Sequence, residues 1–230
     1  MKISIIIPCF NEEKTLSKII DKVLKFKLYE TEIIIVDDCS TDSTADIIKD
    51  LILKFSEIKS IKHERNYGKG AGIKSGVKMS TGDIILIQDA DLEYNPEDYA
   101  NLLEPFLKTD ADVVYGSRFL GGKYVRLSFF WHYIANKLLT TLCNIFTNLN
   151  MTDMETGYKL FKSNVIKSID LKEKSFGIEP EITVKLAKKK YNFYEVPISY
   201  SGRSYEEGKK IGLKDAFKAI YCIVKYRFFN

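Results

Sequence analysis

Short apolar runs that alternate with longer amphipathic stretches constrain the fold of this chain more than any other feature. Residues 33–36 (IIIV) and 84–87 (IILI) are apolar at every position, as strands must be when helices cover both of their faces. Similar runs recur through the first half of the chain. We expect strands at 2–8, 32–37, 58–62, 83–88 and 112–115, and helices at 12–26, 42–55, 70–79 and 96–107. This rhythm predicts an α/β fold with a doubly wound, mostly parallel sheet.

The second half of the chain changes character from about residue 116. Residues 127–149 carry Lys137 as their one formal charge and have the periodicity of an amphipathic helix. Polar residues lie opposite an apolar stripe of Leu127, Trp131, Ile134, Leu138, Leu142, Ile145 and Leu149. We also expect strands near 159–161 and at 193–198, and helices near 181–190 and 213–228. No linker-like segment separates the halves, so the sequence predicts one domain over residues 1–230.

The partners of the two amphipathic helices stay open at this stage. The stripe in 127–149 is expected to pack on the sheet or on a second subunit, in preference to the membrane interface that Phe129, Phe130 and Trp131 at its start would suit. Helix 213–228 combines basic residues with apolar residues that we expect to be buried. Its basic residues are Lys214, Lys218, Lys225 and Arg227, and its apolar ones are Phe217, Ile220, Tyr221, Val224 and Phe228. This composition favours anionic lipid, and peripheral membrane binding is our hypothesis for this helix.

Composition excludes several classes of protein. Hydrophobic residues make up 45% and charged residues 29% of the 230 residues, which is typical of a globular chain and not of a disordered one. A net charge of +4 is too small to indicate nucleic-acid binding. No apolar run reaches the roughly 18 residues of a membrane-spanning helix, and the acids after the first run predict a strand there rather than a signal peptide. Cys9, Cys39, Cys143 and Cys222 form no CxxC pair, which predicts reduced cysteines and a cytoplasmic protein.

Polar side chains follow three of the predicted strands at the point where each ends. Asn11 and Glu12 follow the first strand, Asp37 and Asp38 the second, and Asp89 the fourth. Helix capping is the simpler explanation of such residues, and it suits Asp42, which opens the next helix. The acidic pair ends a strand too early to cap a helix, and ligands of doubly wound sheets bind at the carboxyl ends of the strands. We therefore expect the functional site at this edge.

The segment QDADLE (88–93) is the strongest local signal for chemistry. Asp89 and Asp91 are separated by one residue directly after an apolar strand, so both carboxylates can converge on one hard cation where the chain turns. Mg²⁺ or Mn²⁺ held in this way keeps open positions that phosphate oxygens fill. The alternative is a solvated acidic turn, because this short pattern is common by chance.

The segment RNYGKGAG (65–72) is a second element suited to phosphate. Gly68, Gly70 and Gly72 would let the backbone approach a ligand, and the helix that follows would favour an anion at its N-terminus. The alternative is a flexible turn at the start of a helix. The segment lacks the GxxxxGK[ST] order, and no GxGxxG follows the first strand, so an ATPase and a nicotinamide-binding protein are both excluded.

The ordered set IIIPCFNEE, VDDCSTDST, RNYGKGAG, QDADLE and GSRF resembles the family 2 glycosyltransferases of GT-A fold, and among them the dolichyl- or polyprenyl-phosphate mannose and glucose synthases. The resemblance continues through DMETGYKLF (153–161) and YSGRSYEEGKK (200–210), and thus covers nearly the whole chain. It implies an inverting, metal-dependent enzyme that moves a hexose from a donor of the GDP-mannose or UDP-glucose type to a polyprenyl or dolichyl phosphate at the cytoplasmic face of the membrane. Residues 1–122 would then bind the nucleotide sugar, and residues 123–230 would face the acceptor.

The resemblance also implies roles for individual residues. Those expected to bind the nucleotide sugar are Pro8, Phe10, Glu12, Asp37, Asp38, Lys69, Asp89, Ala90 and Asp91. Mg²⁺ or Mn²⁺ would be held by Asp89, Asp91 and Glu93. The acceptor phosphate would be bound by Arg118, Arg203, Lys209 and Lys210, since the planar fork of arginine suits phosphate oxygens. The catalytic residues would be Asp91, Arg118, Arg203 and Asp153.

The acceptor is the least determined part of this prediction. Members of the synthase group usually carry a compact Gly-x-Ser-Lys element after the last arginine, whereas residues 203–210 form a longer stretch without that serine. A lipid phosphate is already anionic and needs no strong base. A hydroxyl of a surface glycan, the alternative acceptor, would need Asp153 or Glu155 as the base. Lys209 and Lys210 could also be a solvated basic run.

Two other classes of protein stay open after this. A non-catalytic module that binds sugar nucleotides would share the donor motifs but would need no metal chemistry. A nucleotidyltransferase would carry a glycine-rich basic loop after the first strand, where this chain has PCFNE (8–12), and is therefore disfavoured. The sequence leaves the oligomeric state open.

Overall fold

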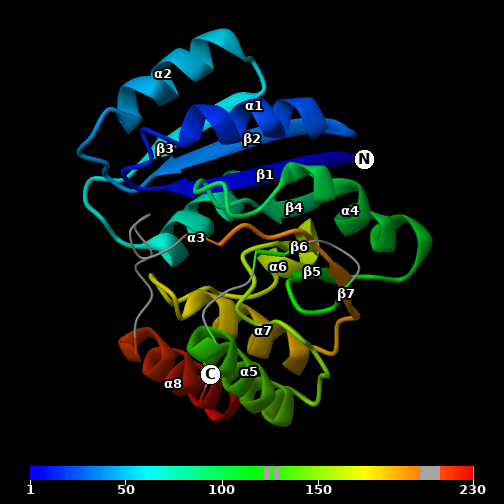
Figure 1. Ribbon diagram of the computed structural model, residues 1–230. Coiled ribbons are helices and arrows are strands. Elements are labelled where there is room, and N and C mark those ends of the chain that lie inside the picture. The colour runs from blue at the N-terminus through cyan, green and yellow to red at the C-terminus, as the bar shows by residue number, and fades with distance from the viewer. Residues whose placement is uncertain (122–124, 127–129, 203–212, 230) are drawn as a thin grey trace.

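The computed structural model describes residues 1–121, 125–126, 130–202 and 213–229, which form a seven-stranded sheet with helices on both faces (Figure 1). The strands are β1 (Lys2–Cys9), β2 (Glu30–Asp37), β3 (Ile58–Lys62), β4 (Ile84–Ile87), β5 (Val113–Ser117), β6 (Lys159–Lys162) and β7 (Phe193–Pro197). Their order is β3-β2-β1-β4-β6-β5-β7, and β6 runs antiparallel to both of its neighbours while the other pairs are parallel. The predicted doubly wound, mostly parallel sheet is confirmed. The predicted halves share this sheet, because β6 lies between β4 and β5.

Two apolar cores explain why the central strands are apolar at successive positions. Ile5 of β1 lies beside Ile33 and Leu86 in a core that is closed by α1 (Leu16–Phe26), α2 (Thr44–Lys54) and α4 (Tyr99–Lys108). The next residue, Ile6, points to the other face. There the core is closed by α3 (Lys69–Met79), α6 (Ser163–Lys167), α7 (Ile178–Lys188), α5 (Phe130–Thr147) and α8 (Leu213–Phe228). Neither face of these strands is left to solvent.

Two helices begin at residues other than those expected. α1 begins at Leu16 rather than at residue 12, because Glu12 and the residues after it form a turn that ends when the Leu16 amide donates to the Glu12 carbonyl (2.9 Å). α7 begins at Ile178, three residues before the expected start. Pro180 lies in its first turn, where the helix needs no N–H donor. This earlier start brings Glu179 into the helix.

The prediction that the stripe on α5 packs on the sheet is wrong for three of its residues, while packing on a second subunit stays a prediction. Trp131, Leu138 and Ile145 are 76%, 66% and 72% exposed, whereas the polar face of the helix turns inward. The buried Thr140 hydroxyl accepts the Met154 amide (3.1 Å). A polar side chain stabilises the protein more when it faces the interior and bonds a buried backbone group that would otherwise lack a partner. Amphipathic periodicity alone therefore assigned the wrong face.

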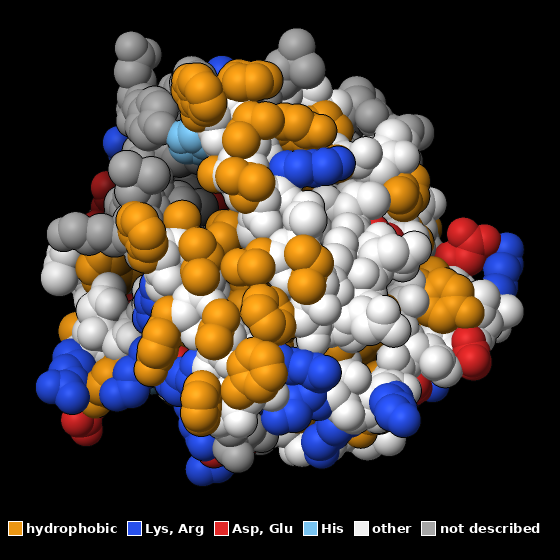
Figure 2. Space-filling model, turned by 90° about the horizontal axis from the view of Figure 1, so that it is seen from below, with side chains coloured by type: hydrophobic (Ala, Val, Ile, Leu, Met, Phe, Trp, Pro, Cys, Tyr) orange, Lys and Arg blue, Asp and Glu red, His pale blue; other side chains and the backbone are white. Residues whose placement is uncertain are grey.

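The same reversal occurs on α8. Phe217 and Phe228 are 72% and 61% exposed, while Cys222, Ile223 and Tyr226 are buried. We use the name apolar face for the apolar side chains of both helices that are more than 60% exposed, which are Phe130, Trp131, Leu138, Ile145, Phe217, Tyr221 and Phe228. Figure 2 shows hydrophobic side chains gathered on this side of the molecule, with lysine and arginine side chains around them. No helix in the described ranges is long and apolar enough to cross a membrane.

Candidate active site

The carboxyl ends of β1, β2, β4 and β5 meet at one edge of the sheet, where most of the predicted functional residues lie (Figure 1). Asp37 ends β2, Asp89 follows β4 and Arg118 follows β5. A chain of contacts joins two of these positions across the edge. Asp38 accepts a hydrogen bond from the Gly68 amide (2.6 Å), and the next residue, Lys69, pairs with Asp89 (2.8 Å).

The two acids at the end of β2 have different surroundings. Asp38 organises the turn after β3, since its carboxylate contacts the His63 ring (2.7 Å) and accepts the amides of Tyr67 (2.9 Å) and Gly68. Asp37 accepts the Ser40 amide through Oδ1 (2.9 Å), and its buried Oδ2 has no hydrogen-bond partner within the part of the chain that the structure describes. An orphaned buried acceptor favours a ligand that brings a donor. Asp37 therefore keeps an unpaired acceptor at this edge, whereas both oxygens of Asp38 accept hydrogen bonds.

The glycine-rich turn has a different use from the one expected. A Cβ atom on Gly68 or Gly70 would overlap the backbone carbonyl of Lys174 or Glu173, and the Ala71 amide donates to the Lys174 carbonyl (3.1 Å). The absence of a Cβ atom at Gly68 and Gly70 thus lets the loop before α7 pack against this turn. The expected close approach of the backbone at Gly68 and Gly70 to a phosphate is wrong on this side of the turn. The φ of +100° at Gly68 also requires glycine there.

Lys69 lies between two carboxylates. Its Nζ is 2.8 Å from Asp89 Oδ1 and 3.2 Å from Glu179 Oε1. Burial alone would lower the pKa of Lys69, but Asp89 and Glu179 outweigh burial and hold the pKa well above its usual value. Lys69 is therefore a fixed cation beside Asp89. Its role in binding the nucleotide stays a prediction.

The predicted metal ligands lie in one turn but are engaged separately. Asp89 pairs with Lys69, Asp91 Oδ1 accepts the Glu93 amide (3.1 Å), and Glu93 accepts the Tyr200 hydroxyl (2.8 Å). Over the residues that the structure describes, no group of three acidic, histidine or cysteine side chains is arranged to hold a metal ion. Leu92, with φ of +66°, turns the chain between them. The carboxylates of Asp89 and Asp91 fit a cation that takes one or two protein ligands and completes its shell with phosphate oxygens.

Asp153 holds the arginine that follows β5. The Arg118 Nε and Nη2 atoms donate to Asp153 Oδ2 (2.6 Å) and Oδ1 (2.7 Å), which is a bidentate pair. Asn136 of α5 adds a third side-chain donor to this carboxylate (3.3 Å), and Asp153 is fully buried. The Arg118 guanidinium also lies over the Tyr200 ring (5.1 Å). The geometry makes Asp153 a positioning residue for Arg118, since its oxygens are already occupied by donors.

Glu155 and Lys159 are buried next to this pair. Burial and the nearby Glu179 carboxylate raise the pKa of Glu155, which favours its protonated form. The Lys159 ammonium donates to the carbonyls of Met154 (2.8 Å) and Thr156 (2.5 Å) and lies over the Tyr115 ring (4.4 Å). These bonds fix the segment that carries Asp153 and Glu155.

The remaining predicted residues lie near the carboxyl ends of β1 and β4 or outside the described ranges. Pro8 and Ala90 are buried, and Phe10 is half-buried. Glu12 accepts the Thr15 hydroxyl (2.5 Å) and donates its amide to Thr44 (2.9 Å), so it organises the turn before α1. Arg203, Lys209 and Lys210 lie outside the described residues, as do Leu127 and Phe129.

Sequence reasoning missed three residues of this site. Gly157 supports Asp89, because a Cβ atom there would overlap Asp89 Oδ2. Tyr200 contacts both Glu93 and Arg118. Glu179 contacts Lys69, and it was missed because the expected helix began at 181. A proline preceded by a glutamate is typical of a first helical turn, and this signal could have found it.

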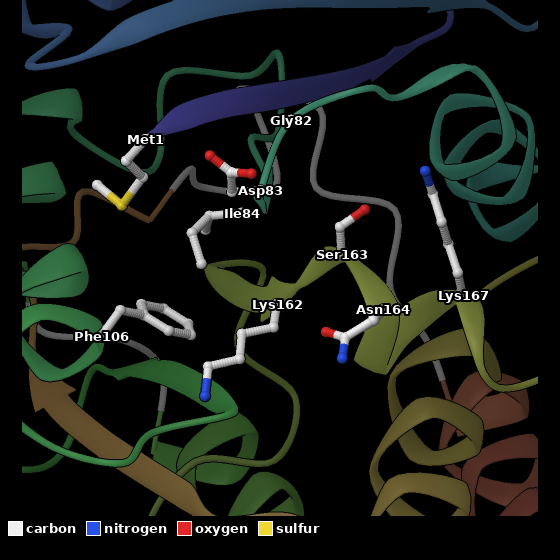
Figure 3. Close-up of a pocket in the computed structure, with 9 residues that line it drawn as sticks. All are labelled: Met1, Gly82, Asp83, Ile84, Phe106, Lys162, Ser163, Asn164 and Lys167. Atoms are coloured by element: carbon white, nitrogen blue, oxygen red, sulfur yellow. The ribbon is translucent and has the colours of Figure 1, made fainter.

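A separate cavity of about 640 Å³ lies at the opposite end of the strands, between the start of β1, the start of β4 and α6 (Figure 3). Lys162 and Lys167 line it, but Lys162 pairs with Asp112 (2.9 Å) and Lys167 donates to the Ser80 carbonyl (2.7 Å). Met1 and Phe106 cover another part of its wall. It shares no residue with the candidate site.

The sheet topology and the acids after β2 and β4 define the GT-A class of nucleotide-sugar transferases. The family model for glycosyl transferase family 2 matches residues 4–170, and the chain therefore belongs to this family.

The relatives agree with this assignment. The chain is 30% identical over 234 residues to a dolichol-phosphate mannosyltransferase of Pyrococcus furiosus, covering 98% of this chain but 64% of that relative. It is 28% identical to a UDP-N-acetylglucosamine–dolichyl-phosphate N-acetylglucosaminyltransferase of Methanococcus voltae, covering 96% of this chain and 94% of the relative. An undecaprenyl-phosphate mannosyltransferase of Micrococcus luteus is 29% identical, with 92% and 88% covered.

A solved structure with the same fold is the glucosyl-3-phosphoglycerate synthase of Mycobacterium tuberculosis in complex with Mn²⁺, UDP and glucosyl-3-phosphoglycerate. Its TM-score is 0.74 at 18% identity, and the match covers 98% of this chain and 79% of that chain. The same synthase has been crystallised with Mg²⁺ and UDP (TM-score 0.72). At this identity the likeness establishes the fold.

Proposed function

We propose that this chain transfers a hexose, with inversion, from a nucleotide-diphosphate sugar to a polyprenyl or dolichyl phosphate at the cytoplasmic face of the membrane. The observation that carries the proposal is the bidentate pair of Arg118 and Asp153 at the edge that also holds Asp89 and Asp91. The pair presents a fixed cation to an anionic acceptor and leaves Asp153 no free oxygen with which to serve as a base. The names of the three relatives support a lipid-phosphate acceptor.

The donor would lie along the carboxyl edge from β2 to β4. Pro8, Phe10 and Asp37 would face the nucleoside, and the orphaned Asp37 Oδ2 would accept a hydroxyl or base N–H. Asp89 and Asp91 would hold Mg²⁺ or Mn²⁺, which would neutralise charge on the departing diphosphate. Lys69 would add a second fixed positive charge on the same side.

The reaction needs no proton transfer when the acceptor is a phosphate. A phosphate oxygen of the lipid forms a bond to the anomeric carbon, the bond from that carbon to the diphosphate oxygen breaks, and the nucleoside diphosphate leaves with the electron pair. Arg118 would orient the attacking phosphate, with Arg203, Lys209 and Lys210 as further candidates outside the described residues. Positioning and charge stabilisation are then sufficient for catalysis.

A hydroxyl acceptor is disfavoured by the state of the two candidate bases. Asp153 is occupied by Arg118. Burial and Glu179 raise the pKa of Glu155, which favours its protonated form, and a protonated carboxyl group cannot accept a proton. A glycan hydroxyl would therefore meet no ready base among these two residues.

The direct test is an acceptor assay. Purified protein with Mn²⁺ and radiolabelled GDP-mannose, UDP-glucose or UDP-N-acetylglucosamine is given dolichyl phosphate, undecaprenyl phosphate or a glycan without phosphate. We expect label in the lipid-phosphate fraction with at least one donor, and none after Asp91→Asn. Transfer to the glycan alone would refute the acceptor. Nucleotide binding with no turnover on any acceptor would favour a binding module.

We also propose that the apolar face of α5 and α8 contacts an anionic bilayer. Trp131 and Phe217 are 76% and 72% exposed, and basic side chains surround the face (Figure 2). Exposed aromatic residues with a cationic rim match the apolar and anionic layers of a membrane surface. Such contact would bring the enzyme to an acceptor whose lipid tail stays in the bilayer.

Point variants test this contact better than truncation, because α8 buries Ile223 and Tyr226 in the core. We expect Trp131→Ala with Phe217→Ala to reduce flotation with phosphatidylglycerol vesicles at least fivefold. Leu53→Ala is the matched control, since Leu53 is 85% exposed on α2. Equal flotation of all three proteins, or indifference to anionic lipid, would refute the contact.

A further inference from the structure

Three buried polar atoms, in the segment before Gly157 and in the first turn of α7, lack a hydrogen-bond partner among the residues in the described ranges. They are Oε2 of Glu179, Oε1 of Glu155 and Oγ1 of Thr156. Glu179 is 6% exposed, so water cannot solvate it freely. Buried polar groups are nearly always paired, and an exception indicates either an ordered water or a ligand.

One of these atoms belongs to a side chain that is linked to Asp89. The Lys69 ammonium joins Glu179 Oε1 (3.2 Å) to Asp89 Oδ1 (2.8 Å), which keeps Glu179 within one side chain of Asp89. Glu155 and Thr156 immediately precede Gly157, against which Asp89 packs so closely that no Cβ atom fits between them. The Glu179 side chain is therefore part of the wall beside Asp89.

The chemistry of this wall selects what it can bind. An anion directly against Glu179 Oε2 is disfavoured, because this oxygen belongs to a carboxylate whose paired cation, Lys69, lies on Oε1. A second cation is disfavoured by Lys69 itself. A neutral group that carries a hydroxyl donor can satisfy Glu179 Oε2 without adding charge.

We infer that Glu179 determines specificity for the transferred sugar, its Oε2 accepting a hydroxyl of the hexose while Lys69 holds its Oε1. This inference rests on the proposed use of a nucleotide-sugar donor. In that donor, the hexose is joined directly to the diphosphate, so it lies next to the group that Asp89 and Asp91 would hold. The ribose lies at the other end of the diphosphate, toward Asp37. A site built to accept a hydroxyl rejects an analogue that lacks it, because a buried acceptor is then left unpaired.

The variant Glu179→Gln keeps the shape of the side chain but exchanges one carboxylate oxygen, an acceptor, for an NH₂ group, a donor. Because Lys69 repels an amide N–H, the glutamine oxygen would stay on Lys69, and the NH₂ group would replace the orphaned oxygen. An acceptor becomes a donor at one position. Glu32→Gln is the matched control, since Glu32 is a buried carboxylate (3% exposed) on β2 that binds Ser4, Lys59 and Thr81 far from Asp89.

The test compares binding of UDP with UDP-glucose, and of GDP with GDP-mannose, by calorimetry in Mn²⁺. We expect Glu179→Gln to weaken binding of the nucleotide sugar at least tenfold while the Kd of the nucleotide diphosphate stays within twofold, and Glu32→Gln to change neither. Equal weakening of both ligands, or of neither, would overturn the inference and leave the proposed function standing. A parent protein that binds none of these four ligands would refute the proposed function, and the inference would fall with it.

Deoxy sugars identify the hydroxyl and separate binding from folding. The analogues are versions of the bound donor that each lack one sugar hydroxyl. We expect one analogue to bind the parent protein at least tenfold more weakly than the full donor does. The same analogue should bind Glu179→Gln no more weakly than it binds the parent protein. Losses that multiply for every analogue would overturn the inference. The thermal midpoint of Glu179→Gln should not fall below that of the parent, since the variant removes a buried charge that lacks a full set of partners. A lower thermal midpoint together with weaker UDP or GDP binding would show that Glu179 has a structural role instead.

Discussion

Gly157 gives the sharpest perturbation of the candidate active site. An alanine methyl group there would overlap Asp89 Oδ2 and lie 2.8 Å from the Tyr94 Cε2 atom, where ordinary contacts begin at 3.4 Å. The Tyr94 ring would have to move by at least 0.6 Å, the difference between these distances, and the Asp89 carboxylate by more. Tyr94 is tied in place because its hydroxyl accepts the Gly157 amide (2.7 Å) and its ring packs on Tyr158. The clash with the Tyr94 ring therefore costs stability, and the clash with Asp89 Oδ2 displaces the Asp89 carboxylate.

The expected effects follow from that displacement. Overpacking of a buried site costs about 1–3 kcal/mol of stability, and a shift of about 1 Å in a group that positions substrate costs on the order of 100-fold in rate. We expect Gly157→Ala to lower kcat/KM for sugar transfer on the order of 100-fold, with a rise in the Mn²⁺ concentration needed for half of the maximal rate. Initial rates with labelled donor and lipid phosphate, together with urea unfolding, measure both.

Gly76→Ala is the matched control. A Cβ atom at Gly76 would overlap the Ile6 side chain within the apolar core, on α3, so it imposes a similar clash away from Asp89. We expect a comparable or smaller loss of stability, since alanine favours a helix over glycine by about 1 kcal/mol, and no change in rate per folded molecule. If Gly157→Ala retained the parent rate, or if Gly76→Ala lost rate equally, the proposed support of Asp89 by Gly157 would be refuted.

Three further predictions concern other parts of the molecule. Asp153→Asn should reduce transfer at least 30-fold with the fold retained by circular dichroism, because it breaks the bidentate grip on Arg118; unchanged kinetics would show that Arg118 needs no such support. Burial opposes ionisation of Glu32, but hydrogen bonds from Ser4, Lys59 and Thr81 outweigh it and lower the pKa of Glu32 to about 2. Its folded pKa is thus below the unfolded value of 4.5, so unfolding free energy should fall by roughly 3 kcal/mol as the pH drops from 5 to 2, and an undiminished acid dependence in Glu32→Gln would contradict this. Removal of divalent ions with EDTA should abolish transfer and Mn²⁺ should restore it; full activity in EDTA would exclude the proposed roles of Asp89 and Asp91.

The sheet and the acidic residues of the site could be predicted because their signals are local. Residues 33–36 and 84–87 are apolar on both faces, and the structure buries both faces. Asp37 and Asp89 follow strands, and strand order alone places them at one edge. The pairing of Lys69 with Glu179 could not be predicted, because it joins residues 110 positions apart across two helix starts. Gly68 and Gly70 look the same in sequence whether they admit a phosphate or a loop.

The orientation of α5 shows why periodicity leaves one question open. A stripe of apolar residues says which side of a helix is apolar and does not say what lies on the other side. Here the polar side is needed inside, since Asn136 donates to Asp153 (3.3 Å) and Asn144 holds the Met151 backbone (2.8 Å). One helix therefore contacts the residue that positions Arg118 and also presents Trp131 outward. If the apolar face rests on a bilayer, the depth of α5 in the lipid sets the height of Asp153 above the membrane. Arg118, which Asp153 holds and which would orient the lipid phosphate, would then lie at a fixed distance from the surface from which that phosphate projects.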